Sequence, residues 1–399
     1  MKHWRRWTGV ALLFTAGVFA VALIFWVVID RRAAAGWRET LGEFRQKTAP
    51  SYAAFAPPAV DAADDAAPLY DDSTLDPQPR DAAFDAMRGR KPADVTETEW
   101  SAAERFVASQ RDVIERLLRA ADRRSCRRPL AYDQGWGMLL PHTAACIVRA
   151  DLLAWDVRLR LRRGEAAGIW PRIRAISALG MSMNDEPSMI CQLTRIAVLN
   201  KALDVAEEAM ALGPPPRGWD DRFDVAAMNR ATARAFAAEF ALVAETQDAF
   251  LAGRPTGTEL DHIAGFTRLK SRPRLYETSS RLLLLLAHAL DVIAMTDLAK
   301  LERLPQIQEM ILKEPGPGSF LVVDLLRPWR NQRRMEARLM LGREAVSPSP
   351  VTPLDPLFKR PIERVASGNG AILRVAATPL ELHAMWSIDA AVEWRMVQR

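Results

Sequence analysis

The sequence predicts a mainly α-helical protein that has an N-terminal transmembrane helix, a multi-helix body and a small, partly β C-terminal segment. Three observations predict this class. A long uncharged apolar run stands near the N-terminus, apolar residues recur at helical spacing through about residues 94–345, and a glycine-centred hairpin pattern lies near the C-terminus. We expect the body to be a helix bundle or a short α-solenoid of the tetratricopeptide type.

The apolar run extends from Trp7 to Ile29 and contains no charged side chain over its 23 residues. A helix of that length reaches about 35 Å, which is enough to cross a hydrocarbon core of roughly 30 Å. A cleaved signal peptide is the rival interpretation, but its apolar region is shorter, and the small residues Ala33–Ala35 follow two arginines here. We therefore predict one membrane-spanning helix, preceded by a basic flank at residues 1–6.

Basic side chains stand on both sides of this predicted span. Three precede it, and five follow it between Arg31 and Lys47, so a literal positive-inside count favours a cytoplasmic body. Short basic N-termini before a first span usually stay inside, however, and long downstream domains are exported largely regardless of their charge. We expect a single-pass protein of the bacterial cytoplasmic membrane, with its body on the periplasmic or extracytoplasmic side.

Residues 30–93 are predicted to form an acidic spacer rich in alanine and proline. The stretch from about Thr48 to Pro92 contains Pro57, Pro58 and many aspartates, a composition that resists continuous helix. We expect one short helix near residues 66–70. The spacer would hold the body away from the bilayer.

The body, residues 94–345, is predicted to consist of successive helices. Thr96 and Glu99 form a capping-box pattern at the first helix, and Gly164 is a C-terminal cap. The acidic pair Asp185 and Glu186 is interpreted as first-turn carboxylates that complement a helix dipole. Apolar spacing places the helices at about residues 98–122, 141–163, 166–183, 187–212, 221–251, 275–304 and 320–342.

Two further predictions concern the C-terminal half. The leucine run Leu282–Leu286 resembles a second span, but His288 and Asp291 interrupt the apolar stretch, so we predict a buried core helix. In residues 346–399 we expect a short hairpin over residues 362–375 and a terminal helix that begins at Pro379.

Five short motifs carry a resemblance to a known family. In the order in which they occur, they resemble a large group of uncharacterised, membrane-anchored helical proteins of planctomycete-type bacteria. The resemblance covers about residues 37–310 and implies architecture alone, because no activity is established for that family; residues 345–399 depart from its typical members. The motifs are Trp37–Leu41, Ala66–Tyr70, Cys126–Leu130, Leu139–His142 and Asp185–Ile190.

Composition and motifs exclude several function classes. The net charge of +5 comes mainly from arginine, with eight lysines among 54 basic residues, and these are spread among 49 carboxylates, so we expect no nucleic-acid surface. The three cysteines are too widely spaced for a CxxC metal site or a disulfide framework, and we expect buried free thiols. Phosphate-loop, dinucleotide, zinc-protease and nucleophile-elbow motifs are absent from the sequence, so no cofactor and no metal ligand is predicted.

Four residues are catalytic candidates because a thiol, a phenol, a carboxylate and an imidazole occur near one another in sequence. They are Cys126, Tyr132, Asp133 and His142. A hydrolase pocket at these residues is one hypothesis. The alternative interpretation of His142 is a histidine that caps the helix or is hydrogen-bonded in a core loop.

The leading functional hypothesis is a non-enzymatic, membrane-tethered helical scaffold that binds a protein partner. It rests on consecutive helices joined by very short turns, which resemble tetratricopeptide-like pairs without a clear repeat. The alternatives are the envelope hydrolase and a module that binds lipid or another envelope component. The last alternative rests on the predicted anchor alone.

Overall fold

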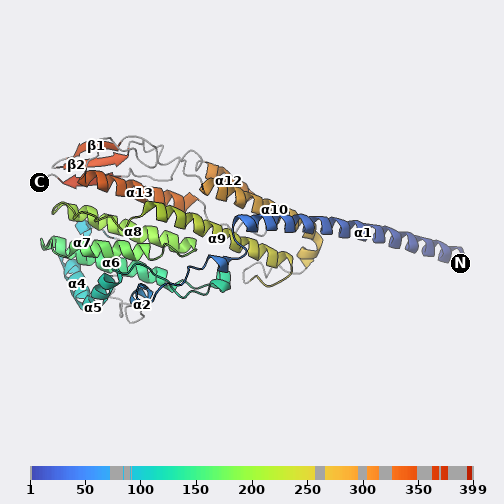
Figure 1. The fold of residues 1–399 in the computed structure, drawn as a ribbon. Coiled ribbons are helices and arrows are strands. Elements are labelled where there is room, and N and C mark those ends of the chain that lie inside the picture. The colour runs from blue at the N-terminus through green and yellow to red at the C-terminus, as the bar shows by residue number, and fades with distance from the viewer. Residues whose placement is uncertain are drawn as a thin grey trace. The chain divides into compact units, whose positions relative to one another are not determined.

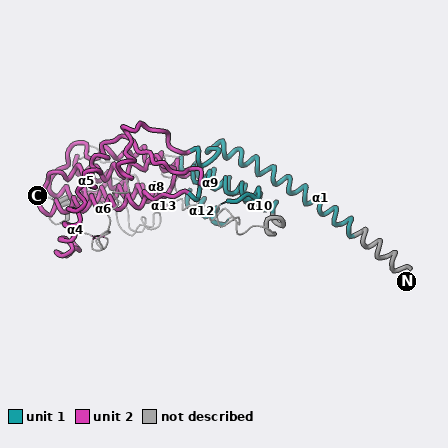
Figure 2. The backbone as a smooth tube through the Cα atoms, turned by 90° about the horizontal axis from the view of Figure 1, so that it is seen from below, with its two compact units in different colours: residues 1–54, 135–137, 237–323 teal, residues 55–134, 138–236, 324–399 magenta. Residues whose placement is uncertain are grey.

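The computed structural model describes residues 2–71, 84, 90, 92–256, 266–294, 303–313, 326–347, 362–367, 370–375 and 393–397. Helices dominate these residues and a small sheet lies near the C-terminus, which confirms the predicted mainly α class. The chain forms two compact units (Figure 2). Unit 1 contains residues 1–54, 135–137 and 237–323, and unit 2 contains residues 55–134, 138–236 and 324–399.

Unit 1 is built around α1, a helix of 46 residues from Lys2 to Lys47, which packs along α10 (Figure 1). From Ala34 onward α1 is amphipathic, because Ala34, Trp37, Leu41 and Phe44 recur at helical spacing and are all buried. The helix therefore continues through residues 30–47. The prediction that the spacer begins at residue 30 is wrong, since this spacing sustains the helix.

In the preceding part of α1, large apolar side chains are exposed. Between Val18 and Ile29 it carries eight large apolar side chains that are 42% to 70% exposed. Among the residues that the structure describes, no helix has both the length and the apolar character that crossing a membrane requires. The predicted span Trp7–Ile29 lies partly outside this description, which covers the side chains of α1 from Thr15 onward.

The leucine run lies within α10 (Phe266–Ile293). Leu282, Leu283 and Leu286 are buried, which confirms the predicted core helix. The neighbouring helix α12 (Arg303–Lys313) packs on α10 through residues such as Ile307. The helix predicted over residues 275–304 therefore begins earlier, and in the described residues its C-terminal part belongs to α12.

Three helices form the centre of unit 2, and each contacts the other two (Figure 1): α6 (Pro141–Arg162), α7 (Ile169–Met181) and α8 (Met189–Met210). The predicted helices are confirmed to within a few residues. Gly164 adopts a left-handed φ of 71° directly after the last turn of α6, as predicted for a cap. Because all three helices are in mutual contact, this part of the body is a bundle.

Two shorter helices cover this centre: α4 (Glu97–Ser109) packs on α6, and α5 (Arg111–Ala120) packs on α7. The predicted capping box of Thr96 and Glu99 is present. The prediction of one helix over residues 98–122 is wrong, because Gln110 leaves the helical region with φ −101° and ψ 19°.

The segment predicted as an extended spacer belongs to the packed body where it is described. It includes the short helices η1 (Tyr52–Phe55), α2 (Ala67–Tyr70) and η3 (Pro92–Asp94). In unit 2, Tyr70 is buried, the Ala66 amide donates to the Ser125 carbonyl over 2.8 Å, and Asp65 accepts from the Arg127 amide over 2.9 Å. These long-range bonds are why residues 55–71 do not act as a spacer, although the short predicted helix at residues 66–70 is confirmed.

The C-terminal part of unit 2 consists of α13 (Leu326–Val346), which packs on α8, and an antiparallel sheet of order β1-β2-β3. The strands β1 (Ile362–Ser367) and β2 (Gly370–Val375) form the predicted hairpin. A strand, β3 (Glu393–Val397), lies where the terminal helix was predicted. The alternation of polar and apolar residues in β3 favours a strand; the start of the predicted helix at Pro379 lies outside the described residues.

A buried arginine joins α8 to its neighbours within unit 2. The Nη2 atom of Arg195 donates to the Met228 carbonyl and the Thr232 hydroxyl of α9 (Val225–Leu251), and to Gln332 of α13. Burial lowers the pKa of Arg195 to about 9. These hydrogen bonds therefore fix the position of α8 relative to α9 and α13, whereas apolar packing alone would allow the helices to shift along one another.

The contact of α7 with α8 yields a first prediction. A Cβ at Gly180 would lie 2.9 Å from two side-chain carbons of Leu199, which is fully buried. We expect Gly180→Ala to lower the free energy of unfolding by about 1–3 kcal/mol. In contrast, Gly42→Ala on α1 meets nothing within 4 Å and should raise it by roughly 0.5–1 kcal/mol. Urea unfolding of both variants measures the change in the free energy of unfolding. Changes of equal size and the same sign in the two variants would contradict the prediction.

Candidate functional site

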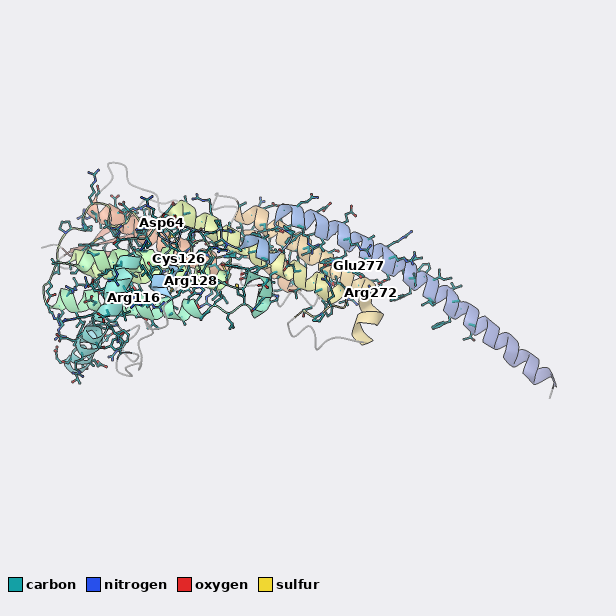
Figure 3. The ribbon with its side chains drawn as sticks, turned by 60° about the horizontal axis from the view of Figure 1, so that its bottom comes forward. Asp64, Arg116, Cys126, Arg128, Arg272 and Glu277 are labelled. Atoms are coloured by element: carbon teal, nitrogen blue, oxygen red, sulfur yellow. The ribbon has the colours of Figure 1, made fainter. Side chains whose placement is uncertain are left out.

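The guanidinium of Arg128, in the segment after α5 of unit 2, is buried and has many hydrogen-bond partners among the described residues (Figure 3). An arginine has five N–H donors. Nε donates to Asp71 at 2.9 Å, Nη1 to Glu186 at 2.7 Å and to the Ser182 carbonyl, and Nη2 to the Ser182 hydroxyl and the Cys146 sulfur. All five donors therefore have acceptors.

Glu186 is the buried carboxylate of this cluster. Its Oε1 atom accepts from Arg128, and its Oε2 atom lies 2.7 Å from Nε2 of His142. Burial alone would raise the pKa of Glu186, but the hydrogen bond from His142 and the charge of Arg128 lower it to about 2. Glu186 is therefore ionised at neutral pH.

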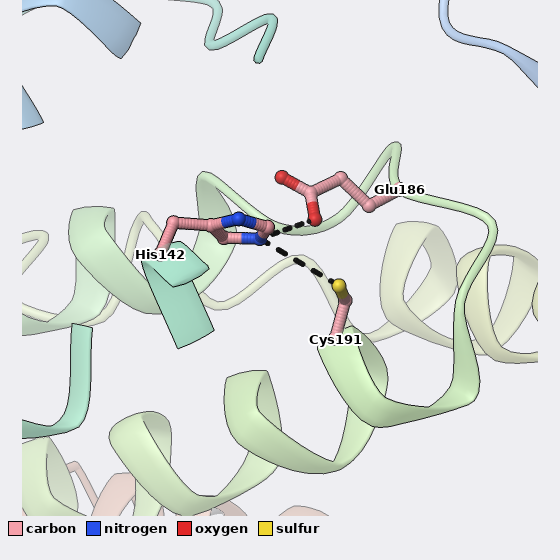
Figure 4. A group of neighbouring side chains, drawn as sticks. All are labelled: His142, Glu186 and Cys191. Atoms are coloured by element: carbon pink, nitrogen blue, oxygen red, sulfur yellow. Dashed lines mark hydrogen bonds and ion pairs between the residues drawn. The ribbon is translucent and has the colours of Figure 1, made fainter. Parts of the chain in front are cut away.

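A third side chain points to the same imidazole nitrogen (Figure 4). The Sγ atom of Cys191 lies 3.7 Å from Nε2 of His142, and the liganding atoms of His142, Glu186 and Cys191 all lie within 4.8 Å of one another. The three residues are buried. The Nδ1 atom of His142 has no hydrogen-bond partner among the described residues.

Local structure brings these residues together from three helix ends. Pro141 begins α6, which places His142 in the first turn and Cys146 one turn later on the same face. Glu186 lies in the loop between α7 and α8. The side chain of Gln192 closes this loop by donating to the carbonyls of Met183 (3.1 Å) and Glu186 (2.7 Å).

Glu186 does not have the role that the sequence suggested. It was interpreted with Asp185 as a first-turn carboxylate, but α8 begins at Met189 with Ser188 as its N-terminal cap, and its first turn holds no acidic residue. Asp185 is exposed and Glu186 is buried. The interpretation is wrong because α8 begins only at Met189, beyond Pro187, and because Glu186 forms a buried ion pair with Arg128.

The thiols of this region are poor nucleophiles. Burial raises the pKa of Cys146 to about 11 and that of Cys126 to about 12, and it raises the pKa of Cys191 well above its usual value. Thiolates are therefore rare at neutral pH. The three thiols are free, as predicted, although Cys126 is only partly buried.

The geometry also differs from a proton relay. A catalytic histidine contacts its nucleophile through one ring nitrogen and its orienting carboxylate through the other. In this site the thiol and the carboxylate both lie at Nε2. Sulfur, nitrogen and oxygen atoms that converge on one point are instead typical of the ligands of a metal ion such as Zn²⁺.

The four predicted catalytic candidates have different positions. His142 lies in the buried cluster, in the first turn of α6, and is hydrogen-bonded to Glu186; it does not cap the helix, since the cap position is Leu140 and no side chain bonds there. Asp133 is exposed, whereas Tyr132 is buried and desolvation raises its pKa. Within the described residues, neither Cys126 nor Asp133 forms a hydrogen bond with His142.

Sequence reasoning missed the partners that His142 does have. Arg128 and Glu186 were noted within short motifs, and Cys191 was expected to be a buried thiol without a role. A spacing of 44 residues separates His142 from Glu186, so no local pattern joins them. The available signal was weak: Glu186 and Cys191 flank a helix start, and a buried carboxylate requires a partner.

Comparisons of the chain with protein-family models, curated proteins and solved structures give no match. The resemblance to planctomycete-type membrane-anchored proteins therefore stays a prediction. The interpretation of this site rests on its own geometry.

The lowered pKa of Glu186 yields a second prediction. Because this pKa is about 2 in the fold against an ordinary value of 4.5, ionised Glu186 stabilises the protein fully above pH 4.5. This contribution is lost as the pH falls from 4.5 towards 2, with a slope of about 1.4 kcal/mol per pH unit for one group. Glu186→Gln should remove that slope and lower stability at pH 7 by about 3 kcal/mol or more.

Urea unfolding of the wild-type protein and of Glu186→Gln is repeated across this pH range. The difference between their free energies of unfolding at each pH measures the effect. Asp185→Asn is the matched control, since it removes an exposed neighbouring carboxylate. Equal pH slopes in the wild-type protein and in the Glu186 variant would contradict the assigned ion pair.

Proposed function

We propose that this chain is a single-pass membrane protein whose helical body is a non-enzymatic scaffold for a protein partner. The observation that carries the proposal is the change along α1 from exposed to buried apolar side chains. Its side chains from Val18 to Ile29 are apolar and exposed, whereas Trp37, Leu41 and Phe44 on the same helix are buried in unit 1. Among the described residues, one helix thus has an apolar surface that is exposed and an amphipathic part that packs.

A bilayer is the environment that suits the first part. A helix that is apolar on all sides is buried in a large core or in lipid. Transferring eight such side chains from water into hydrocarbon would contribute on the order of 10 kcal/mol. Trp26 stands near one end of the predicted span, and Asp30, Arg31 and Arg32 follow it, as is usual at a membrane interface.

Two properties of unit 2 bear on the scaffold role: the raised pKa values of its thiols and its exposed apolar side chains at helix ends. Its thiols have raised pKa values, and the Nε2 atom of His142 already faces a carboxylate and a thiol, so a hydrolase at these residues would lack an activated nucleophile. Leu139, before α6, is 80% exposed, and Ile190, in the first turn of α8, is 57% exposed. Single exposed apolar side chains are ordinary on protein surfaces, and these two serve the proposal as positions at which a partner contact can be tested.

The anchor gives a third prediction. The wild-type chain should stay in the membrane pellet after alkaline carbonate extraction. Phe19→Lys combined with Ile24→Lys should release it, because each lysine near the middle of a span costs about 2.5–3.5 kcal/mol. Leu312→Lys is the control, since it charges an equally exposed apolar residue on α12. Wild-type chain in the aqueous fraction would overturn the anchor.

The orientation gives a fourth prediction. We propose that the N-terminus is cytoplasmic and that the body lies outside. A C-terminal alkaline phosphatase fusion should then be active and a C-terminal green fluorescent protein fusion dark. A phosphatase fusion to residues 30–399, which lack the predicted span, is the control and should be inactive. The opposite pair of results would place the body in the cytoplasm and leave the anchor intact.

A further inference from the structure

The cluster at the N-terminal ends of α6 and α8 has one feature that the scaffold proposal does not use. A thiol, an imidazole nitrogen and a carboxylate oxygen converge at a buried point, and no apolar core requires such a combination. Buried polar groups are costly unless bonded, and the Nδ1 atom of His142 and the Oε1 atom of Gln192 have no partners among the described residues. Neither atom is one of the three that converge, so the inference rests on the convergence of sulfur, nitrogen and oxygen itself.

We propose that His142, Glu186 and Cys191 form a binding site for a divalent transition-metal ion of the zinc type. Thiolate, imidazole and carboxylate are the ligands that zinc takes in proteins. Calcium and magnesium prefer sites made of oxygen alone, so a sulfur and a nitrogen ligand argue against them.

The distances suit a tetrahedral ion. Bond lengths of about 2.0–2.3 Å place the ligand atoms of such an ion roughly 3.3–3.8 Å apart. The separation of 3.7 Å between Sγ of Cys191 and Nε2 of His142 already falls in this range. Nε2 and Oε2 of Glu186 are 2.7 Å apart because they share a hydrogen bond, and this pair must open by roughly 0.7 Å.

The charges also balance. When the ion binds, the Cys191 thiol releases its proton to solvent, and a neutral His142 carries its proton on Nδ1 and offers the Nε2 lone pair. One thiolate and one carboxylate then neutralise the two positive charges of the ion, which a buried site requires. Asp71 remains as the counter-charge of Arg128.

Neighbouring groups already orient the ligands. Arg128 holds the Oε1 atom of Glu186, which directs Oε2 towards His142, and Gln192 holds the backbone of Glu186. Such supporting bonds are a regular part of metal sites. Metal binding thus requires a local opening and not a new arrangement of the loop.

Three protein ligands leave a fourth position for water or another donor. The residues that precede two of the ligands are exposed: Asp185 precedes the buried Glu186, and Ile190 precedes the buried Cys191. Because the ligands themselves are buried, an ion reaches them only if the surrounding chain moves.

The fifth prediction tests this site with cobalt, a spectroscopic substitute for zinc. Full-length protein in detergent, freed of metal by a chelator, should develop a thiolate-to-cobalt charge-transfer band with one equivalent of Co²⁺, and Zn²⁺ should abolish it. Cys191→Ser should remove the band, and His142→Gln and Glu186→Gln should weaken cobalt binding at least tenfold. Zinc should raise the Tm of the wild-type protein but not that of Cys191→Ser.

The matched controls are Cys126→Ser and Cys146→Ser, which remove thiols that lie near Arg128 but outside the three ligands. Both should keep the band. Circular dichroism identifies any variant that does not fold, and the wild-type titration decides the question without the variants. A folded wild-type protein that gives no cobalt–thiolate band, or a band that persists in Cys191→Ser, would overturn the proposal.

Discussion

The burial of one guanidinium, that of Arg128, is the constraint on which the core of unit 2 depends. A charged group removed from water requires a counter-charge and an acceptor for each donor, and the loss of a carboxylate partner weakens that compensation in the core. Arg128 obtains its acceptors from the residue after α2, from α6, and from the loop between α7 and α8. Segments that are distant in sequence must therefore lie together around Arg128. This requirement fixes the conformation of loops that apolar packing alone would not fix.

Arg195 shows the opposite solution in the same unit. Its Nη2 atom has neutral acceptors on α9 and α13, and Asn184 accepts from its Nη1 atom. Without a bonded carboxylate, desolvation prevails and lowers the pKa of Arg195 to about 9, whereas Glu186 beside Arg128 is strongly acidic. Arg128 thus lies in an ionic cluster with two carboxylates, whereas Arg195 joins three helices through neutral acceptors.

The sequence predicted what depends on local pattern. Apolar spacing located α6, α7 and α8, the capping box located α4, and the glycine-centred turn located β1 and β2. It failed where distant contacts decide the outcome. Asp65 and Ala66 looked like spacer residues because their bonds to Arg127 and Ser125 span about sixty positions. Glu186 looked like a helix-dipole residue because its real partners, Arg128 and His142, are equally remote.

The continuity of α1 changes how an anchored body would be held. A flexible spacer would let the body move freely near the bilayer, but α1 remains helical from the apolar segment to Lys47. Ala34, the first buried residue in the described part of α1, lies five positions after Ile29, a rise of about 7.5 Å, so the core of unit 1 begins roughly one and a half helical turns beyond the apolar segment. Because Trp37 donates to Asp248 and Lys47 pairs with Asp291, that helix cannot pivot freely on unit 1. A membrane that fixed the helix would therefore also fix unit 1.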